Sequence, residues 1–77
     1  MAFGPSPKQQ LLDLAQILYP NSLIEVLGYR AKNYGGKKPP FTAQVNIDGR
    51  CQLTVQERDH RKAYKLAQIT LSRMTAI

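Results

Sequence analysis

Two clusters of basic residues are the part of this sequence best suited to binding a ligand. Residues 30–40 hold four cations and no acid, and residues 58–65 hold four cations and one acid, Asp59. The whole chain has 11 Lys and Arg against 5 Asp and Glu, which gives a formal net charge of +6. Two separated basic clusters favour a polyanion that is contacted at two places. The alternative is a solvated basic surface without a partner.

The other chemically active side chains do not form a catalytic or metal-binding pattern. One cysteine, Cys51, and one histidine, His60, exclude an internal disulfide and are too few for a structural zinc site. Residues 35–38, Gly-Gly-Lys-Lys, lack the spacing of a nucleotide-binding phosphate loop and precede prolines instead of a helix. We therefore expect a non-enzymatic binding domain that uses no metal and no cofactor.

The length and the apolar segments bound the organisation of the chain. The 77 residues predict one domain over residues 1–77. No apolar run approaches the roughly 18 residues that span a bilayer, and the N-terminal segment lacks the pattern of a secretory signal. We expect an intracellular protein with no membrane partner.

The first half of the chain predicts a helix and a strand. Ser6-Pro7 is typical of a helix start, and leucines recur at helical spacing until Pro20, which predicts a helix over residues 7–19. Residues 22–32 are rich in branched and aromatic side chains and predict a strand, with Gly28 as a candidate bulge.

The clearest pattern is a hairpin over residues 41–56. Apolar and polar residues alternate over 41–47 and again over 51–56, and Asp48-Gly49 between them is a strong turn signal. The two strands should share one apolar face. The alternation places Cys51 on that face, so we expect Cys51 in the core.

A second helix should follow, with Asp59 as its N-cap. Its expected inner face holds Ala63, Leu66, Ala67, Thr70 and Met74, with Leu71 beside them. The order is helix, three antiparallel strands, helix. This predicts an α+β fold, α-β-β-β-α, with both helices packed on the apolar face of a three-stranded sheet.

This arrangement resembles the double-stranded RNA-binding domain (dsRBD) over roughly residues 6–75. The first helix is similar to that of the family in its proline, paired leucines, acid and Leu-Ala-Gln, at residues 7–16. Phe41 after a basic loop with glycines and prolines, and the basic segment at residues 60–67, are also similar to the family. The resemblance implies binding of A-form duplex RNA with little sequence preference.

The resemblance also implies three contact regions on one face of the domain. The first helix and the loop between the first two strands reach successive minor grooves, and the start of the last helix meets phosphates across the major groove. Basic side chains and free N–H groups at a helix start also suit phosphate on physical grounds alone. The implied RNA-binding residues are Gln9, Asp13, Lys37, Lys38, His60, Arg61, Lys62 and Lys65.

The sequence departs from the family at the start of the last helix. The preceding turn has no glycine and holds Glu57 and Asp59, and Tyr64 stands where the family has a lysine. Carboxylates near phosphate are repulsive, so the alternative is a domain of this fold that binds a protein partner or forms a homodimer. An exposed apolar patch would favour that alternative; the candidate pairs are Ile69 with Leu71 and Leu23 with Leu27.

Overall fold

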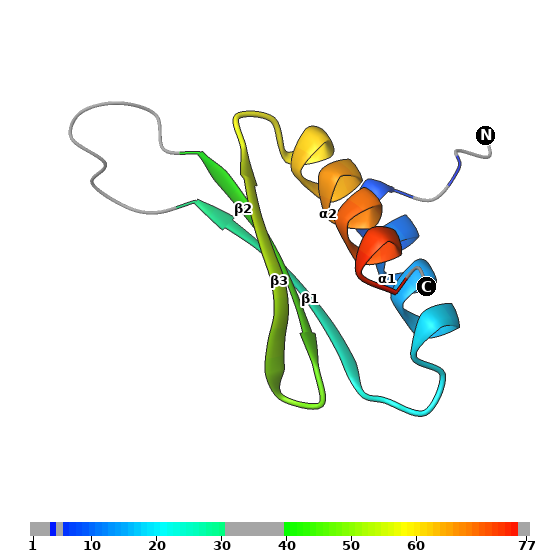
Figure 1. Ribbon diagram of the computed structural model, residues 1–77. Helices are drawn as coiled ribbons and strands as arrows, with labels where there is room; N and C mark the ends of the chain where they lie inside the picture. Colours follow the sequence, from blue (N-terminus) through cyan, green and yellow to red (C-terminus); the bar gives the residue numbers. More distant parts are fainter. Residues whose placement is uncertain (1–3, 5, 31–39, 76–77) are drawn as a thin grey trace.

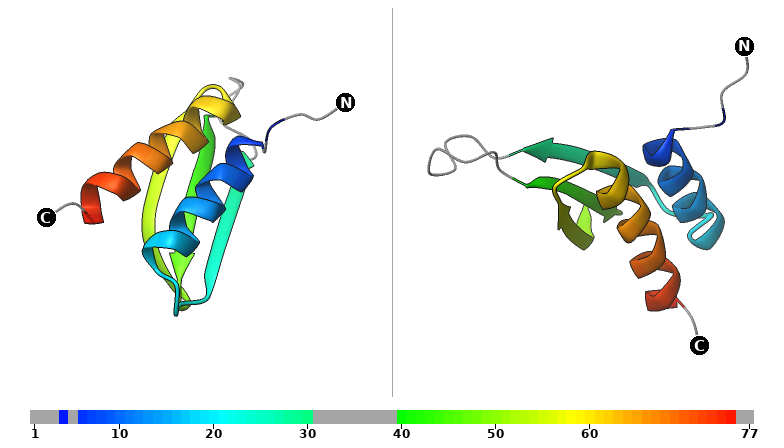
Figure 2. Two further views of the ribbon diagram at one scale, coloured as in Figure 1. Left: turned by 90° about the vertical axis from the view of Figure 1, so that its right-hand side faces the viewer. Right: turned by 90° about the horizontal axis from the view of Figure 1, so that it is seen from above.

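The computed structural model describes residues 4, 6–30 and 40–75. Its elements are α1 (Pro7–Leu18), β1 (Ile24–Arg30), β2 (Phe41–Ile47), β3 (Arg50–Glu57) and α2 (His60–Thr75) (Figure 1). The strands form one antiparallel sheet in the order β1-β2-β3. Both helices lie on the same face of this sheet (Figure 2). The predicted α-β-β-β-α fold is therefore confirmed.

Helix α1 begins and ends where its local sequence requires. The hydroxyl of Ser6 accepts a hydrogen bond from the amide of Gln9 at 3.2 Å, and Pro7 occupies the first helical position. The last turn closes with the Tyr19 amide donating to the Ala15 carbonyl at 2.8 Å. The helix stops there because the proline at position 20 disfavours helical geometry at Tyr19.

The hairpin forms as predicted, but a bulge changes the face of one residue. Asp48 and Gly49 both have positive φ, 54° and 80°, as a tight two-residue turn requires. The pairing then passes from Asn46–Cys51 to Val45–Leu53, which leaves Gln52 as an extra residue in β3. Cys51 therefore lies opposite Asn46 and is exposed. The prediction that Cys51 is a core residue is wrong.

The core lies between the sheet and the two helices. Leu11 and Ala15 of α1, Val45 of β2, and Ala67 and Leu71 of α2 are fully buried in it. The half-buried side chains of Phe41 and Val55 pack against this core. The expected apolar face of the hairpin is thus the face that the helices cover.

The inner face of α2 differs from the prediction at three positions. Leu66 and Met74 are 36% and 48% exposed, whereas Tyr64 is buried. The fully buried residues Ala63, Ala67 and Leu71 are spaced four apart, and the two alanines allow the helix to approach the sheet closely. Leu66 then lies to one side of the row formed by Ala63, Ala67 and Leu71. Tyr64 lies on the other side of this row and extends towards β1.

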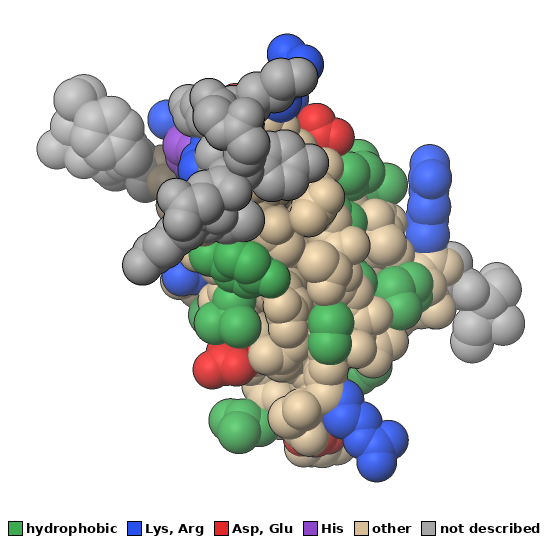
Figure 3. Space-filling model, turned by 90° about the vertical axis from the view of Figure 1, so that its left-hand side faces the viewer, with side chains coloured by type: hydrophobic (Ala, Val, Ile, Leu, Met, Phe, Trp, Pro, Cys, Tyr) green, Lys and Arg blue, Asp and Glu red, His purple; other side chains and the backbone are tan. Residues whose placement is uncertain are grey.

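The outer face of the sheet holds polar side chains with hydrophobic ones scattered among them, and few charges (Figure 3). A chain of hydrogen bonds crosses it: the Tyr29 hydroxyl donates to Gln44, the Gln44 amide to Asn46, and the Asn46 amide to Glu25. Lys and Arg side chains lie around the margin of this face (Figure 3). The described residues therefore offer a polyanion no cationic surface at the centre of the sheet, and their basic side chains lie towards its ends.

Candidate functional site

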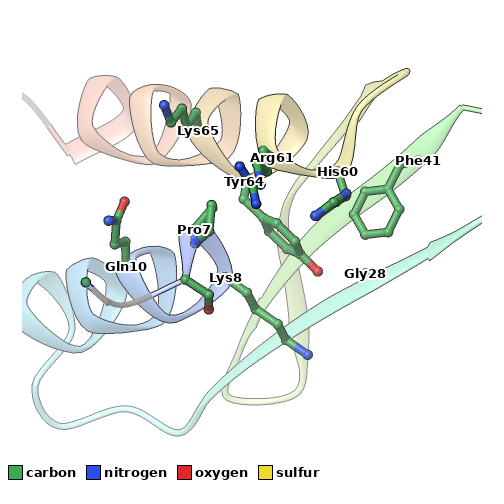
Figure 4. Close-up of a pocket in the computed structure, with 11 residues that line it drawn as sticks. Pro7, Lys8, Gln10, Gly28, Phe41, His60, Arg61, Tyr64 and Lys65 are labelled. Carbon is green, nitrogen blue, oxygen red and sulfur yellow. The ribbon is translucent and has the colours of Figure 1, made fainter. Parts of the chain in front are cut away.

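Both helices begin at the same end of the sheet, where β1 ends and β2 begins (Figure 2). A hollow of about 710 Å³ opens between the two helix starts (Figure 4). Its basic lining residues are Lys8 from α1 and His60, Arg61 and Lys65 from α2, and among the described residues no Asp or Glu lines it. The positive ends of two helix dipoles add to these charges. We refer to this feature as the α1–α2 hollow.

The inner wall of the α1–α2 hollow is the phenol ring of Tyr64. The relative exposure of Tyr64 is only 6%, and its hydroxyl points towards Gly28 in β1 (Figure 4). A Cβ atom at position 28 would collide with that hydroxyl and approach Cζ of Phe41 to 2.5 Å. Position 28 therefore needs glycine for space. No residue in the described part of the chain forms a hydrogen bond with the Tyr64 hydroxyl, and no buried polar side-chain atom there lacks a partner, so the hydroxyl oxygen is accessible from the hollow.

Burial raises the pKa of the Tyr64 phenol above its ordinary value of 10.0. The folded state favours the neutral phenol, so the stabilisation is complete below the unfolded pKa and is lost as the pH rises towards the folded pKa. We expect the free energy of unfolding to fall more steeply between about pH 9 and pH 11 in the wild type than in Tyr64→Phe. Urea denaturation at several pH values measures this. Equal slopes for the two proteins would contradict a neutral buried phenol.

An aromatic cluster fixes the start of α2 against the sheet. The ring of Phe41 meets the rings of Tyr64 and His60 edge-on, at centroid distances of 5.4 Å and 6.0 Å. The Arg30 guanidinium lies 5.6 Å from the centroid of Phe41, and its Nη2 donates to the Arg58 carbonyl at 2.9 Å. These contacts hold the basic residues of the first turn of α2 beside the ends of β1 and β2.

The structure brings together three of the eight residues implied by the resemblance. His60, Arg61 and Lys65 line the α1–α2 hollow, whereas the exposed Lys62 does not. Arg61 and Lys65 are four residues apart and therefore share one side of α2. The positions of Lys37 and Lys38 lie outside the described residues.

Gln9 and Asp13 form a pair on the exposed side of α1. The Gln9 amide donates to Asp13 Oδ1 at 2.8 Å, and neither residue lines the α1–α2 hollow. The side-chain oxygen of Gln9 is an acceptor, and its amide nitrogen has a second N–H. This pair is chemically suited to hydroxyl groups of a ligand, which can both donate to a carboxylate and accept from an amide.

The start of α2 offers fewer free amides than the sequence suggested. Asp59 Oδ1 accepts from the amide of Arg61 at 3.1 Å, which confirms Asp59 as the N-cap. The same carboxylate oxygen lies 3.5 Å from Nδ1 of His60. An anion bound in the α1–α2 hollow would therefore be held mainly by side chains, since the cap already satisfies the amide of Arg61.

Four residues of this site were not identified as binding residues from the sequence. From the sequence, Lys8 has no predicted role, and Phe41 is used only as a feature of the resemblance to the dsRBD family. Gly28 was interpreted as a bulge, yet β1 pairs with β2 without interruption from Ile24 to Arg30. Tyr64 was seen as a substituted lysine. The available signal that α2 turns Tyr64 inward was its spacing of three and seven residues from Ala67 and Leu71, which places them on the same side of a helix.

Comparisons with protein-family models, with curated proteins and with solved structures found no match to this chain. Within the described ranges, no helix is long and apolar enough to cross a membrane. In the same ranges, His, Cys, Asp and Glu form no group of three that could hold a metal ion.

Proposed function

We propose that this domain binds double-stranded RNA and recognises the shape of the A-form duplex, as its resemblance to the dsRBD family implies. The observation that carries the proposal is the gathering of Lys8, Arg61 and Lys65 from two helices at one end of the sheet. That end also holds Arg30 and Phe41, the residues from which the basic segment 31–39 departs. Both basic clusters of the sequence are thus attached to the same end of the fold.

The arrangement of polar and charged groups supports duplex RNA over other polyanions. The exposed pair Gln9 and Asp13 lies on α1, and the basic residues of α2 lie across the hollow from the start of that helix. Amide and carboxylate groups are suited to ribose 2′-hydroxyls, and the cations are suited to phosphates. Contacts at fixed separations measure the shape of the helix, so sequence preference should be weak.

The two acids near the start of α2 are less of an obstacle than the sequence suggested. Neither Glu57 nor Asp59 lines the α1–α2 hollow. Asp59 serves as the cap of α2 through its bond to the Arg61 amide. A phosphate in the hollow would therefore not contact these carboxylates directly, and their repulsion of it is weaker for that reason.

The alternative is that the same fold binds a protein partner or a second copy of this chain. Its support is the exposed apolar surface on α2, where Leu66 and Ile69 lie three residues apart. The pairs expected from the sequence do not form such a patch, because Leu71 is fully buried and Leu27 is half-buried. RNA is the preferred proposal because neither expected pair forms a continuous exposed apolar patch.

We expect the domain to bind duplex RNA more tightly than duplex DNA or single-stranded RNA of the same length and sequence. With about four phosphates neutralised, log K should fall against log salt with a slope near −3 to −4. Fluorescence anisotropy at several salt concentrations measures both the affinities and the slope. Equal affinity for RNA and DNA duplexes would reduce the site to a generic basic surface. Absence of salt-dependent binding would favour the protein-partner alternative.

A further inference from the structure

The α1–α2 hollow has features that binding to the backbone of a duplex does not require. It is concave, its volume of about 710 Å³ is within the range of small-molecule sites, roughly 300–1,000 Å³, and aromatic rings form part of its wall. Phosphates of a duplex backbone can be bound by an open basic surface. A hollow with an aromatic wall suits a ligand that combines a phosphate with a ring.

The Tyr64 hydroxyl is the observation that points to a ligand in this space. The relative exposure of Tyr64 is only 6%. Its hydroxyl lies at the wall of the hollow, between β1 and the start of α1 (Figure 4). No described residue hydrogen-bonds to it. Since no buried polar side-chain atom of the described residues lacks a partner, this hydroxyl is accessible from the hollow and can donate to a phosphate oxygen there.

We infer that the α1–α2 hollow binds one nucleotide through its phosphomonoester, with Lys8 and Arg61 contacting the phosphate and the Tyr64 hydroxyl donating to it. A phosphomonoester has three acceptor oxygens and close to two negative charges at neutral pH. A phosphodiester inside a strand has two free oxygens and one charge. The monoester therefore matches the cations from two helices and the accessible Tyr64 hydroxyl better than an internal backbone phosphate does.

The ring of the nucleotide would lie against the apolar wall of the hollow. Pro7, Phe41 and the Tyr64 ring supply this wall. Such a nucleotide has two sources: a free nucleoside 5′-monophosphate, or the 5′-phosphorylated end of an RNA strand. For the second source the inference rests on the proposed function, because the hollow would then recognise the end of the RNA that the domain binds.

The experiment compares two blunt RNA duplexes of one sequence, one with 5′-phosphates and one with 5′-hydroxyls, and adds 5′-AMP as the free nucleotide. We expect the 5′-phosphate to tighten binding roughly 3- to 10-fold, as charge-assisted hydrogen bonds should. Tyr64→Phe and Lys8→Ala should each reduce this ratio towards one. Arg50→Ala removes the same charge as Lys8→Ala but lies outside the hollow, at the hairpin, and should keep the ratio.

The outcomes separate the inference from the proposed function. Equal binding of the two RNA duplexes, with RNA still preferred over DNA and no NMR shifts at Gly28 or Tyr64 on addition of 5′-AMP, would overturn the inference alone. Binding of 5′-AMP at the hollow without duplex binding would support the inference with a free nucleotide and overturn the proposed function. A 5′-phosphate effect that survives Tyr64→Phe and Lys8→Ala would place the end phosphate elsewhere and overturn the inference.

Discussion

Replacing Arg61 and Lys65 by alanine is expected to weaken binding of duplex RNA roughly 10- to 100-fold and to flatten the salt slope by about 2. The two side chains lie one turn apart on α2 and line the same hollow, so both should neutralise phosphates of one backbone segment. Residual binding to duplex DNA should fall in parallel, because phosphate contacts are shared by both polymers. Anisotropy titrations at several salt concentrations measure each quantity.

The matched control removes the same charge from other parts of the molecule. Arg50 at the hairpin and Arg73 in the last turn of α2 do not line the hollow. Replacing both by glutamine also lowers the net charge by two, yet it should leave most of the RNA affinity intact. A similar loss in both double variants would indicate a diffuse charge effect. Unchanged affinity in a folded Arg61→Ala/Lys65→Ala protein would remove the central site of the RNA-binding proposal.

The order of helices and strands could be predicted from the sequence because the local signals agree with each other. The Ser6 cap, the two alternating runs and Asp48-Gly49 each specify one element, and each forms as predicted. The face of Cys51 was not predictable from this pattern. A tight turn and a continuous alternation cannot both place every apolar residue inward, and the bulge at Gln52 resolves that conflict.

The candidate site was predictable in its charges but not in its shape. The second basic cluster indicated Arg61 and Lys65, because charge at a helix start can be identified from sequence alone. The contribution of Lys8 depends on how α1 lies beside α2, which the order of elements does not specify. The buried position of Tyr64 depends on Gly28, 36 residues earlier in the chain, and a contact over that separation has no local signal.

The contact between Gly28 and Tyr64 leads to the second prediction of large effect. Gly28→Ala should destabilise the domain by about 1–3 kcal/mol, because the new methyl group would overlap the Tyr64 hydroxyl and the ring of Phe41. Alanine is otherwise favoured over glycine inside a strand by roughly 0.5–1 kcal/mol, so the steric cost must exceed this gain. Gly4→Ala is the matched control, because a Cβ there meets nothing within 4 Å.

Removing the Tyr64 hydroxyl should relieve part of that overlap. Tyr64→Phe alone should change stability by less than about 1 kcal/mol, since no described residue bonds to the hydroxyl. In the double variant Gly28→Ala/Tyr64→Phe, the destabilisation should be about 1 kcal/mol smaller than the sum of the single changes, as expected for residues in contact. The remaining cost would come from Phe41, whose Cζ also approaches the new methyl group. Urea denaturation of the four proteins gives this coupling directly. Strict additivity would show that glycine is needed at position 28 for a reason other than the space taken by Tyr64.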